Sequence, residues 1–193
     1  YVLTITGTIA ISPILLVIAL WIYKDSPGPV IFKHRRIGKN GKEFNCYKFR
    51  SMCVDAKEKL EQLLKNDPEA KAEYEKYHKL ENDPRVTKCG KILRKTSLDE
   101  LPQIFNVLKG EMSLIGPRPY MVNEYQDNKE VLKNILLAKP GITGYWQVSG
   151  RNDVTFGERI AMEDWYVTNW NLWIDFVILY KTFKVVFGKK GAY

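Results

Sequence analysis

The first 23 residues contain no charged side chain, and this run constrains the fold more than any other feature of the chain. A helix of about 23 residues rises about 34 Å, which is enough to cross the hydrocarbon core of a bilayer. The segment that follows, residues 24–50, is rich in lysine and arginine. Such basic flanks are typical of the cytoplasmic side of a membrane helix. We therefore expect a membrane-anchored protein whose polar part lies on the cytoplasmic face.

The apolar run is interrupted near its middle by Ser12-Pro13. Proline removes one helical hydrogen bond and clashes with the preceding turn, which kinks a helix. Membrane helices tolerate such kinks, so the residues by themselves favour a kinked helix that spans the bilayer. The alternative is a helix that bends at Ser12-Pro13 and returns to the side from which it entered.

The remaining chain predicts an α+β fold that is mainly helical. Two strand-like stretches, 30–36 and 43–49, flank Asn40-Gly41, which is a strong signal for a small β-hairpin. Apolar spacing predicts two helices between residues 55 and 80, divided at Pro68, in a charged surface excursion without a catalytic role. A basic helix should follow over 87–95, although Gly90 weakens that prediction.

The aromatic residues gather in the last third of the chain, between Trp165 and Phe187. Tryptophan and tyrosine favour membrane interfaces, so this stretch predicts amphipathic helices that lie in the headgroup plane. An ordinary aromatic core is the alternative. The net charge of +8 favours anionic partners, namely nucleic acid, an anionic leaflet or phosphorylated substrates. A nucleic-acid binder would need stacking aromatics near its basic residues, and here the two are far apart in sequence, so we expect no nucleic acid.

Two adjacent carboxylates, Asp99 and Glu100, follow the basic helix. Ser97 and Glu100 match a capping box, which predicts that a helix starts there and places both carboxylates in its first turn. Four apolar residues then fall on one face of that helix: Leu101, Ile104, Phe105 and Leu108. The carboxylates could serve only as a cap, which is the simpler interpretation of the spacing.

A catalytic role is the alternative for these carboxylates. A helix N-terminus can hold a phosphate, and cations beside it would let a carboxylate attack a phosphorylated substrate. Candidate cations come from three separate segments: Lys48, Arg94 and Arg118.

Several long motifs together resemble the bacterial sugar transferase family, the monotopic phosphoglycosyl transferases. In order, they are Ser12-Pro13, Ser26-Pro27-Gly28-Pro29, residues 36–41, 47–52, 93–103, 106–110, 113–119 and 140–144, and Gly150-Arg151-Asn152. The resemblance covers nearly the whole chain. It implies that residues 1–23 form a re-entrant membrane helix hairpin broken at Ser12 and Pro13. It also implies that residues 24–193 form one catalytic domain on the cytoplasmic face of the bacterial inner membrane.

The resemblance further implies a ping-pong transfer of hexose-1-phosphate from a UDP-sugar to undecaprenyl phosphate. Asp99 would form the covalent phosphosugar intermediate and contact Mg²⁺, and Glu100 would orient groups or move a proton. The cations that would bind the phosphates or the substrate are Lys48, Arg94, Arg118 and Arg151. Galactose is the expected sugar, with glucose or N-acetylhexosamine as alternatives, in the first membrane step of O-antigen, capsule, exopolysaccharide or S-layer glycan synthesis. A homodimer is expected by the same resemblance, and a non-catalytic anchor for glycan assembly is the other class that stays open.

Overall fold

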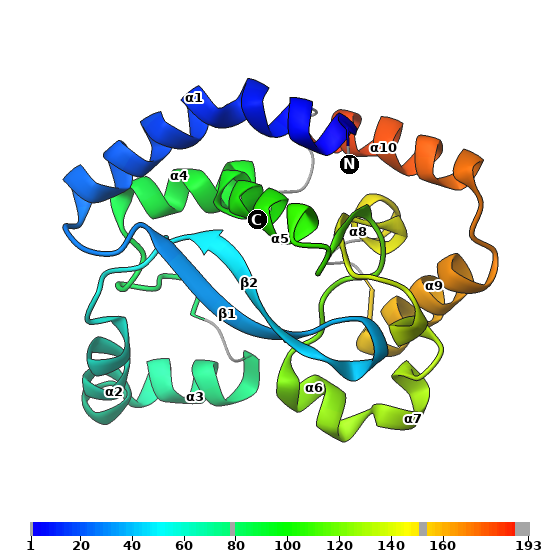
Figure 1. The fold of residues 1–193 in the computed structure, drawn as a ribbon. Helices are drawn as coiled ribbons and strands as arrows, with labels where there is room; N and C mark the ends of the chain where they lie inside the picture. The colour runs from blue at the N-terminus through cyan, green and yellow to red at the C-terminus, as the bar shows by residue number, and fades with distance from the viewer. Residues whose placement is uncertain (1, 78–79, 151–153, 188–193) are drawn as a thin grey trace.

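The computed structural model describes residues 2–77, 80–150 and 154–187 (Figure 1). Its helices are α1 (Val2–Asp25), α2 (Ala56–Asn66), α3 (Pro68–Tyr77), α4 (Lys88–Thr96), α5 (Ile104–Leu108), α6 (Val122–Asp127), α7 (Lys129–Leu132), α8 (Tyr145–Ser149), α9 (Phe156–Thr168) and α10 (Leu172–Phe187). Short 3₁₀ segments are η1 (Lys39–Gly41), η2 (Leu98–Gln103) and η3 (Ile135–Leu137), and the strands are β1 (Ile31–Ile37), β2 (Glu43–Phe49), β3 (Ser113–Ile115) and β4 (Gly141–Thr143). The predicted α+β, mainly helical class is confirmed.

The hairpin β1–β2 lies at the centre of the molecule and is antiparallel, with Phe32 opposite Lys48 and His34 opposite Cys46 (Figure 1). Its turn places Asn40 at φ 57° and Gly41 at φ 74°. Asparagine and glycine adopt this left-handed conformation more readily than other residues, which is why Asn-Gly marked the turn in the sequence. The β3–β4 pair is parallel and two-stranded.

Helix α1 runs unbroken through Pro13 and curves along one edge of the molecule (Figure 1). Pro13 has no N–H to offer to the carbonyl of Ile9, four residues earlier, and the Ser12 hydroxyl donates to that carbonyl at 2.8 Å instead. The Ser-Pro pair thus supplies the bend together with a replacement for the lost hydrogen bond. Within the described residues, Thr4–Asp25 is the one helix long and apolar enough to cross a membrane. The re-entrant path stays a prediction.

Three small apolar clusters hold the hairpin in place. One joins α1 and α4 to the end of β2 and contains Ile18, Ile22, Phe49, Cys89 and Leu93. A second packs β2 against α5 and contains Cys46, Val107 and Met112. The third lies at the far end of β1 and contains Ile37, Tyr120, Leu132, Ile135, Leu136 and Ile160. Both ends of the hairpin are therefore anchored, one next to α1 and the other next to α9.

Helix α10 exposes most of its aromatic residues. Trp173 is 75% exposed, and the other exposed rings are those of Phe176, Tyr180 and Phe183. Ile178 is buried, and Asp175 accepts a hydrogen bond from the hydroxyl of Tyr166 in α9 at 2.7 Å. Figure 1 shows α10 along the same edge as α1. The prediction that α10 lies in a membrane interface stays a prediction.

The predicted helix start at Ser97 is wrong. Ser97 has φ 56°, its N–H bonds the carbonyls of Leu93 and Arg94 to end α4, and its side chain makes no capping hydrogen bond. The next six residues form η2, and an α-helix begins only at Ile104, because Pro102 cannot donate a backbone hydrogen bond. Asp99 and Glu100 therefore sit in a short 3₁₀ segment, and the helix-dipole argument for a phosphate site loses its basis.

The predicted apolar stripe is correct only in part. Ile104 is buried, but Phe105 is 42% exposed, and Asn106 and Val107 are buried in its place. Asn106 faces inward because its amide joins α5 to β2: its oxygen accepts from Tyr47 N–H at 2.9 Å and its nitrogen donates to the carbonyl of Asn45 at 2.7 Å. Hydrogen bonds to the hairpin thus set the orientation of α5.

Candidate active site

The predicted site residues Lys48, Asp99 and Glu100 come together where β2 meets η2. Lys48 donates from Nζ to Oε1 of Glu100 at 2.6 Å, across 52 positions of sequence. Their side chains are 24% and 35% exposed, so the ion pair lies at the rim of the site, where solvent and ligands reach it. Glu100 thereby fixes the position of the lysine ammonium.

Asp99 differs from its neighbour in having no such partner. Among the described residues, no side chain donates a hydrogen bond to its carboxylate. The pKa of Asp99 is raised to about 6, because burial and the nearby Glu100 carboxylate outweigh the positive charges of Lys48 and Arg94. Asp99 is thus a partly buried carboxylate within electrostatic range of two cations, and its oxygens remain available to a ligand.

Arg94 is placed by a close approach of α4 to the chain after β2. Its Nε donates to the hydroxyl of Ser51 at 2.9 Å. A Cβ on Gly90 would lie 1.9 Å from the backbone oxygen of Ser51, so α4 can lie against this segment only with glycine at that position. Gly90, which weakened the helix prediction, is therefore explained by packing that brings Arg94 to the site.

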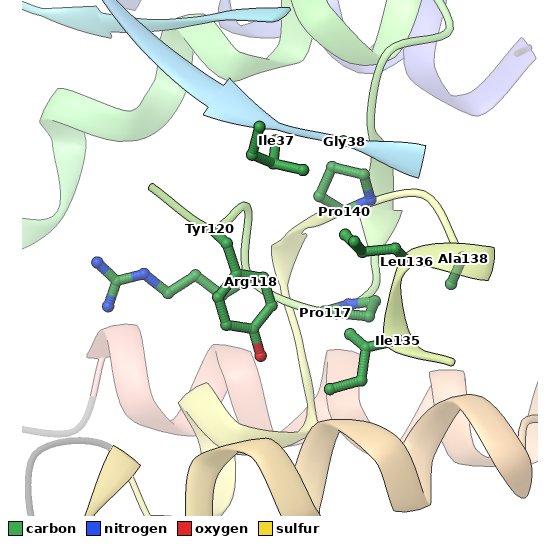
Figure 2. A pocket seen from close by; sticks show the side chains of 9 residues that line it. All are labelled: Ile37, Gly38, Pro117, Arg118, Tyr120, Ile135, Leu136, Ala138 and Pro140. Atoms are coloured by element: carbon green, nitrogen blue, oxygen red, sulfur yellow. The ribbon is translucent and has the colours of Figure 1, made fainter. Parts of the chain in front are cut away.

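Arg118 is presented by the turn Gly116–Pro119, which the buried carboxylate of Glu163 in α9 holds. Glu163 accepts the N–H of Arg118 at 2.9 Å and the hydroxyl of Tyr120. Figure 2 shows a small pocket beside this turn, and the Arg118 side chain extends away from it. Its guanidinium lies 5.5 Å from the ring centre of Trp146. Besides Arg118, the pocket is lined mostly by apolar residues, namely Ile37, Gly38, Pro117, Tyr120, Ile135, Leu136, Ala138 and Pro140.

Two residues of β1, His34 and Arg36, join the site although the sequence analysis did not select them. In the hairpin register they share a face with Lys48, because partners across the ladder and every second residue point the same way. Burial and the nearby Arg118 lower the pKa of Arg36. Strand alternation was the signal that could have found them, since Lys48 was already a candidate.

Arg151, the fourth predicted cation, lies outside the described residues. In the part of the chain that the structure describes, no group of three or more His, Cys, Asp and Glu side chains is arranged to hold a metal ion. Mg²⁺ needs no such cage, because it is usually bound through one or two carboxylates together with substrate phosphates and water. The carboxylate oxygens of Asp99 fit this kind of donor set.

The sequence of this chain matches known proteins over nearly its whole length. A family described as bacterial sugar transferase matches residues 1–189. An uncharacterized sugar transferase of Haemophilus influenzae is 55% identical over 192 residues, covering 98% of this chain and 41% of that protein. An undecaprenyl-phosphate galactose phosphotransferase of Salmonella typhimurium is 54% identical over 182 residues, covering 94% of this chain and 38% of that protein.

A more distant relative carries a different sugar in its name. The UDP-glucose:undecaprenyl-phosphate glucose-1-phosphate transferase of Escherichia coli is 39% identical over 191 residues, covering 95% of this chain and 38% of that protein. The chain therefore spans about two fifths of the length of these three relatives.

Proposed function

The chain belongs to the bacterial sugar transferase family, and from this premise we propose that it transfers a sugar-1-phosphate from a UDP-sugar to undecaprenyl phosphate. One observation carries the proposal: the Asp99 carboxylate has no side-chain partner among the described residues, and it lies within range of Lys48 and Arg94. A carboxylate placed in this way can act as a nucleophile toward a phosphorus whose negative oxygens the cations neutralise.

Galactose-1-phosphate is the transferred group that we propose. The support is the higher identity to the galactose phosphotransferase of Salmonella typhimurium, 54%, than to the glucose-1-phosphate transferase of Escherichia coli, 39%. Glucose-1-phosphate or an N-acetylhexosamine-1-phosphate are the alternatives. The product would start an O-antigen, capsule, exopolysaccharide or S-layer glycan.

In the first half-reaction, an oxygen of Asp99 attacks the phosphorus that carries the sugar. The bond between this phosphorus and the oxygen that bridges it to the uridine phosphate breaks, and UMP leaves with the electron pair. The phosphosugar is then held on Asp99 as an acyl phosphate. Lys48, fixed by Glu100, and Arg94, fixed by Ser51, stabilise the negative charge on the phosphoryl oxygens.

In the second half-reaction, an oxygen of undecaprenyl phosphate attacks the phosphosugar. The bond to Asp99 breaks, the carboxylate is restored, and undecaprenyl-diphospho-sugar leaves. Glu100 acts here as the group that positions Lys48, because its Oε1 already accepts the Lys48 hydrogen bond. Bound Mg²⁺, which Asp99 would contact, supplies further charge neutralisation for the phosphates.

The apolar helices suit a substrate with a long lipid tail. Helix α1 exposes most of its apolar side chains, and α10 exposes its aromatic rings. We propose that α1 is the re-entrant helix and α10 the interfacial helix, which together hold residues 24–193 on the cytoplasmic face of the inner membrane. The phosphate of undecaprenyl phosphate would then reach Asp99 without leaving the headgroup layer. A homodimer stays a prediction.

The test is the release of UMP by detergent-solubilised protein supplied with undecaprenyl phosphate, Mg²⁺ and a panel of UDP-sugars. We expect release with UDP-galactose, and a loss of about 10⁴-fold or more in Asp99→Asn, as seen when a catalytic nucleophile is removed. Asp127→Asn, at an exposed aspartate at the end of α6, is the matched control and should keep wild-type turnover. Wild-type turnover in Asp99→Asn would contradict the nucleophile assignment. Glycan synthesis that persists in cells with that variant would favour the non-catalytic anchor.

A further inference from the structure

Arg36 is a buried cation without a matching anion. Arg36 is only 5% exposed. Its hydrogen-bond partners are the carbonyl of Pro119, 3.4 Å from Nη1, and Nδ1 of His34, 3.3 Å from Nη2. Within the described residues, no carboxylate lies at ion-pair distance from it. Burying an unpaired charge is costly, so the position is explained if an anion completes it.

The two carboxylates that act electrostatically on Arg36, those of Glu124 and Glu100, are already engaged. Glu124 of α6 accepts from Nη2 of Arg159 at 3.1 Å and from the N–H of Met121 at 2.7 Å. These contacts hold the pKa of Glu124 below its ordinary value despite burial. Glu100 is likewise bound to Lys48. Both carboxylates are thus bound to other groups, and Arg36 is left to bind an anionic ligand.

His34 extends this site with a neutral donor. An arginine can only donate, so Nδ1 of His34 accepts from Arg36 and the imidazole proton sits on Nε2. Burial, together with the charges of Arg36, Lys48 and Arg118, lowers the pKa of His34 to about 4, although Glu124 opposes them. His34 therefore lies among three cations, uncharged at neutral pH, with one N–H to give.

We propose that Arg36 and His34, together with Arg118, form a second phosphate subsite next to Asp99. It would bind the phosphate that is not transferred, and this assignment rests on the function proposed above. Lys48 links this subsite to Asp99. It shares the hairpin face with His34, and its ammonium group pairs with Glu100, the residue next to Asp99. The transferred phosphorus would sit at Lys48 and Asp99, and its neighbour phosphate at Arg36.

Because each displacement is in line, two different phosphates would occupy this subsite, one after the other. Asp99 attacks opposite the leaving phosphate of UMP, and the acceptor must later attack opposite Asp99. The phosphate of undecaprenyl phosphate therefore arrives on the side that UMP has left. UMP and undecaprenyl phosphate each present a phosphate monoester to the subsite, and experiments can distinguish the binding of one from the binding of the other.

The first experiment measures UMP affinity and the KM for undecaprenyl phosphate with the full chain in detergent. Arg36→Gln should weaken both by about ten- to a hundredfold, the scale of a charge-assisted hydrogen bond. Arg36→Lys should recover part of the loss because it keeps the charge. Arg35→Gln is the matched control, since Arg35 lies on the opposite face, is largely exposed, and pairs with Glu43.

A change in UMP affinity alone would assign the subsite to the nucleotide, and a change in the KM for the acceptor alone would assign it to the lipid phosphate. If Arg36→Gln folds and changes neither, the inference is overturned. If the wild type releases UMP from no UDP-sugar, the proposed function fails, whereas Arg36-dependent UMP binding would still support the subsite.

A second experiment does not depend on a variant at Arg36. The chain has two histidines, so nitrogen-15 spectra of wild type and His78→Gln assign the imidazole of His34. UMP should shift the His34 signal and raise its pKa, because a bound anion offsets the surrounding cations. Uridine, which lacks the phosphate, should do neither. An unchanged His34 signal at saturating UMP would contradict the subsite.

Discussion

The α2–α3 excursion and the face of the β1–β2 hairpin that carries Arg36 and Lys48 are both rich in charged residues, but the burial and pairing of these charges differ. On α2–α3 most charged side chains are exposed, and two lysines pair with acids one helical turn away, Lys59 with Asp55 at 3.2 Å and Lys71 with Glu75 at 3.9 Å. On the hairpin face, Arg36 is buried without an acid and Lys48 meets Glu100 only at the rim. Both regions carry many charges, but of the two it is the hairpin that buries a cation without an ion-paired acid.

This difference separates charge that serves solubility from charge that serves binding. Exposed pairs are screened by water and contribute little to stability. A partly buried cation is screened less, so an anion near it gains more from the interaction. We infer that the binding surface of this protein is marked by the burial of its cations and not by their number, and four measurements test this inference.

The largest effect is expected at Lys48. Lys48→Gln should lower kcat for UMP release by about 10²- to 10³-fold, the scale for removing one group that stabilises transition-state charge. Lys42→Gln, at an exposed lysine of the same hairpin, should leave kcat unchanged. Equal effects of the two variants would show that burial does not distinguish the cations.

The next effect concerns a buried charge that is fully engaged. Glu163 accepts from Arg118 N–H and Tyr120 hydroxyl, so Glu163→Gln turns an amide N–H₂ toward a donor. We expect the free energy of unfolding to fall by about 1–3 kcal/mol, the cost of an unsatisfied buried group. Urea denaturation in detergent measures it, with Glu130→Gln on the exposed face of α7 as the control. No loss of stability would mean that Glu163 does not hold the Gly116–Pro119 turn.

A smaller effect should follow pH. Burial is the main cause that raises the pKa of Asp99 to about 6, and the proposed nucleophile is its ionised form. As pH falls through 6 the carboxylate gains a proton, so kcat/KM for the UDP-sugar should fall about tenfold per pH unit below that value. The pKa of Asp55 in the excursion is instead lowered by hydrogen bonds from Cys53 and Lys59. A profile of kcat/KM that stays flat down to about pH 4.5 would contradict the role of Asp99.

The smallest effect is expected on the excursion. Lys71→Gln removes one exposed charge and its ion pair, and it should change the free energy of unfolding by no more than about 0.5 kcal/mol. Turnover should stay at the wild-type rate. A marked loss of turnover would mean that α3 contributes to the site, and the contrast between the two charged regions would not hold.

Local features were predictable from the sequence. The apolar run predicted α1, Asn40-Gly41 predicted the hairpin turn, and Pro68 divided α2 from α3 at the expected place. Lys48, Arg94, Asp99 and Glu100 were selected from motifs, and the structure brings them together. These predictions succeed because turn chemistry, proline and apolar runs act within a few residues of the chain.

Other features of the fold and the site depend on contacts between segments that are distant in sequence. Ser97 ends α4 and starts no α-helix, Phe105 turns outward, and Arg36 becomes a buried cation beside Pro119, which lies 83 residues away. The sequence alone determined that this chain has a long apolar N-terminal segment and a carboxylate pair among cations. Which cations lack an acid was set by folding, because burial depends on segments that are distant in sequence and meet only when α4, η2 and the Gly116–Pro119 turn close around the hairpin.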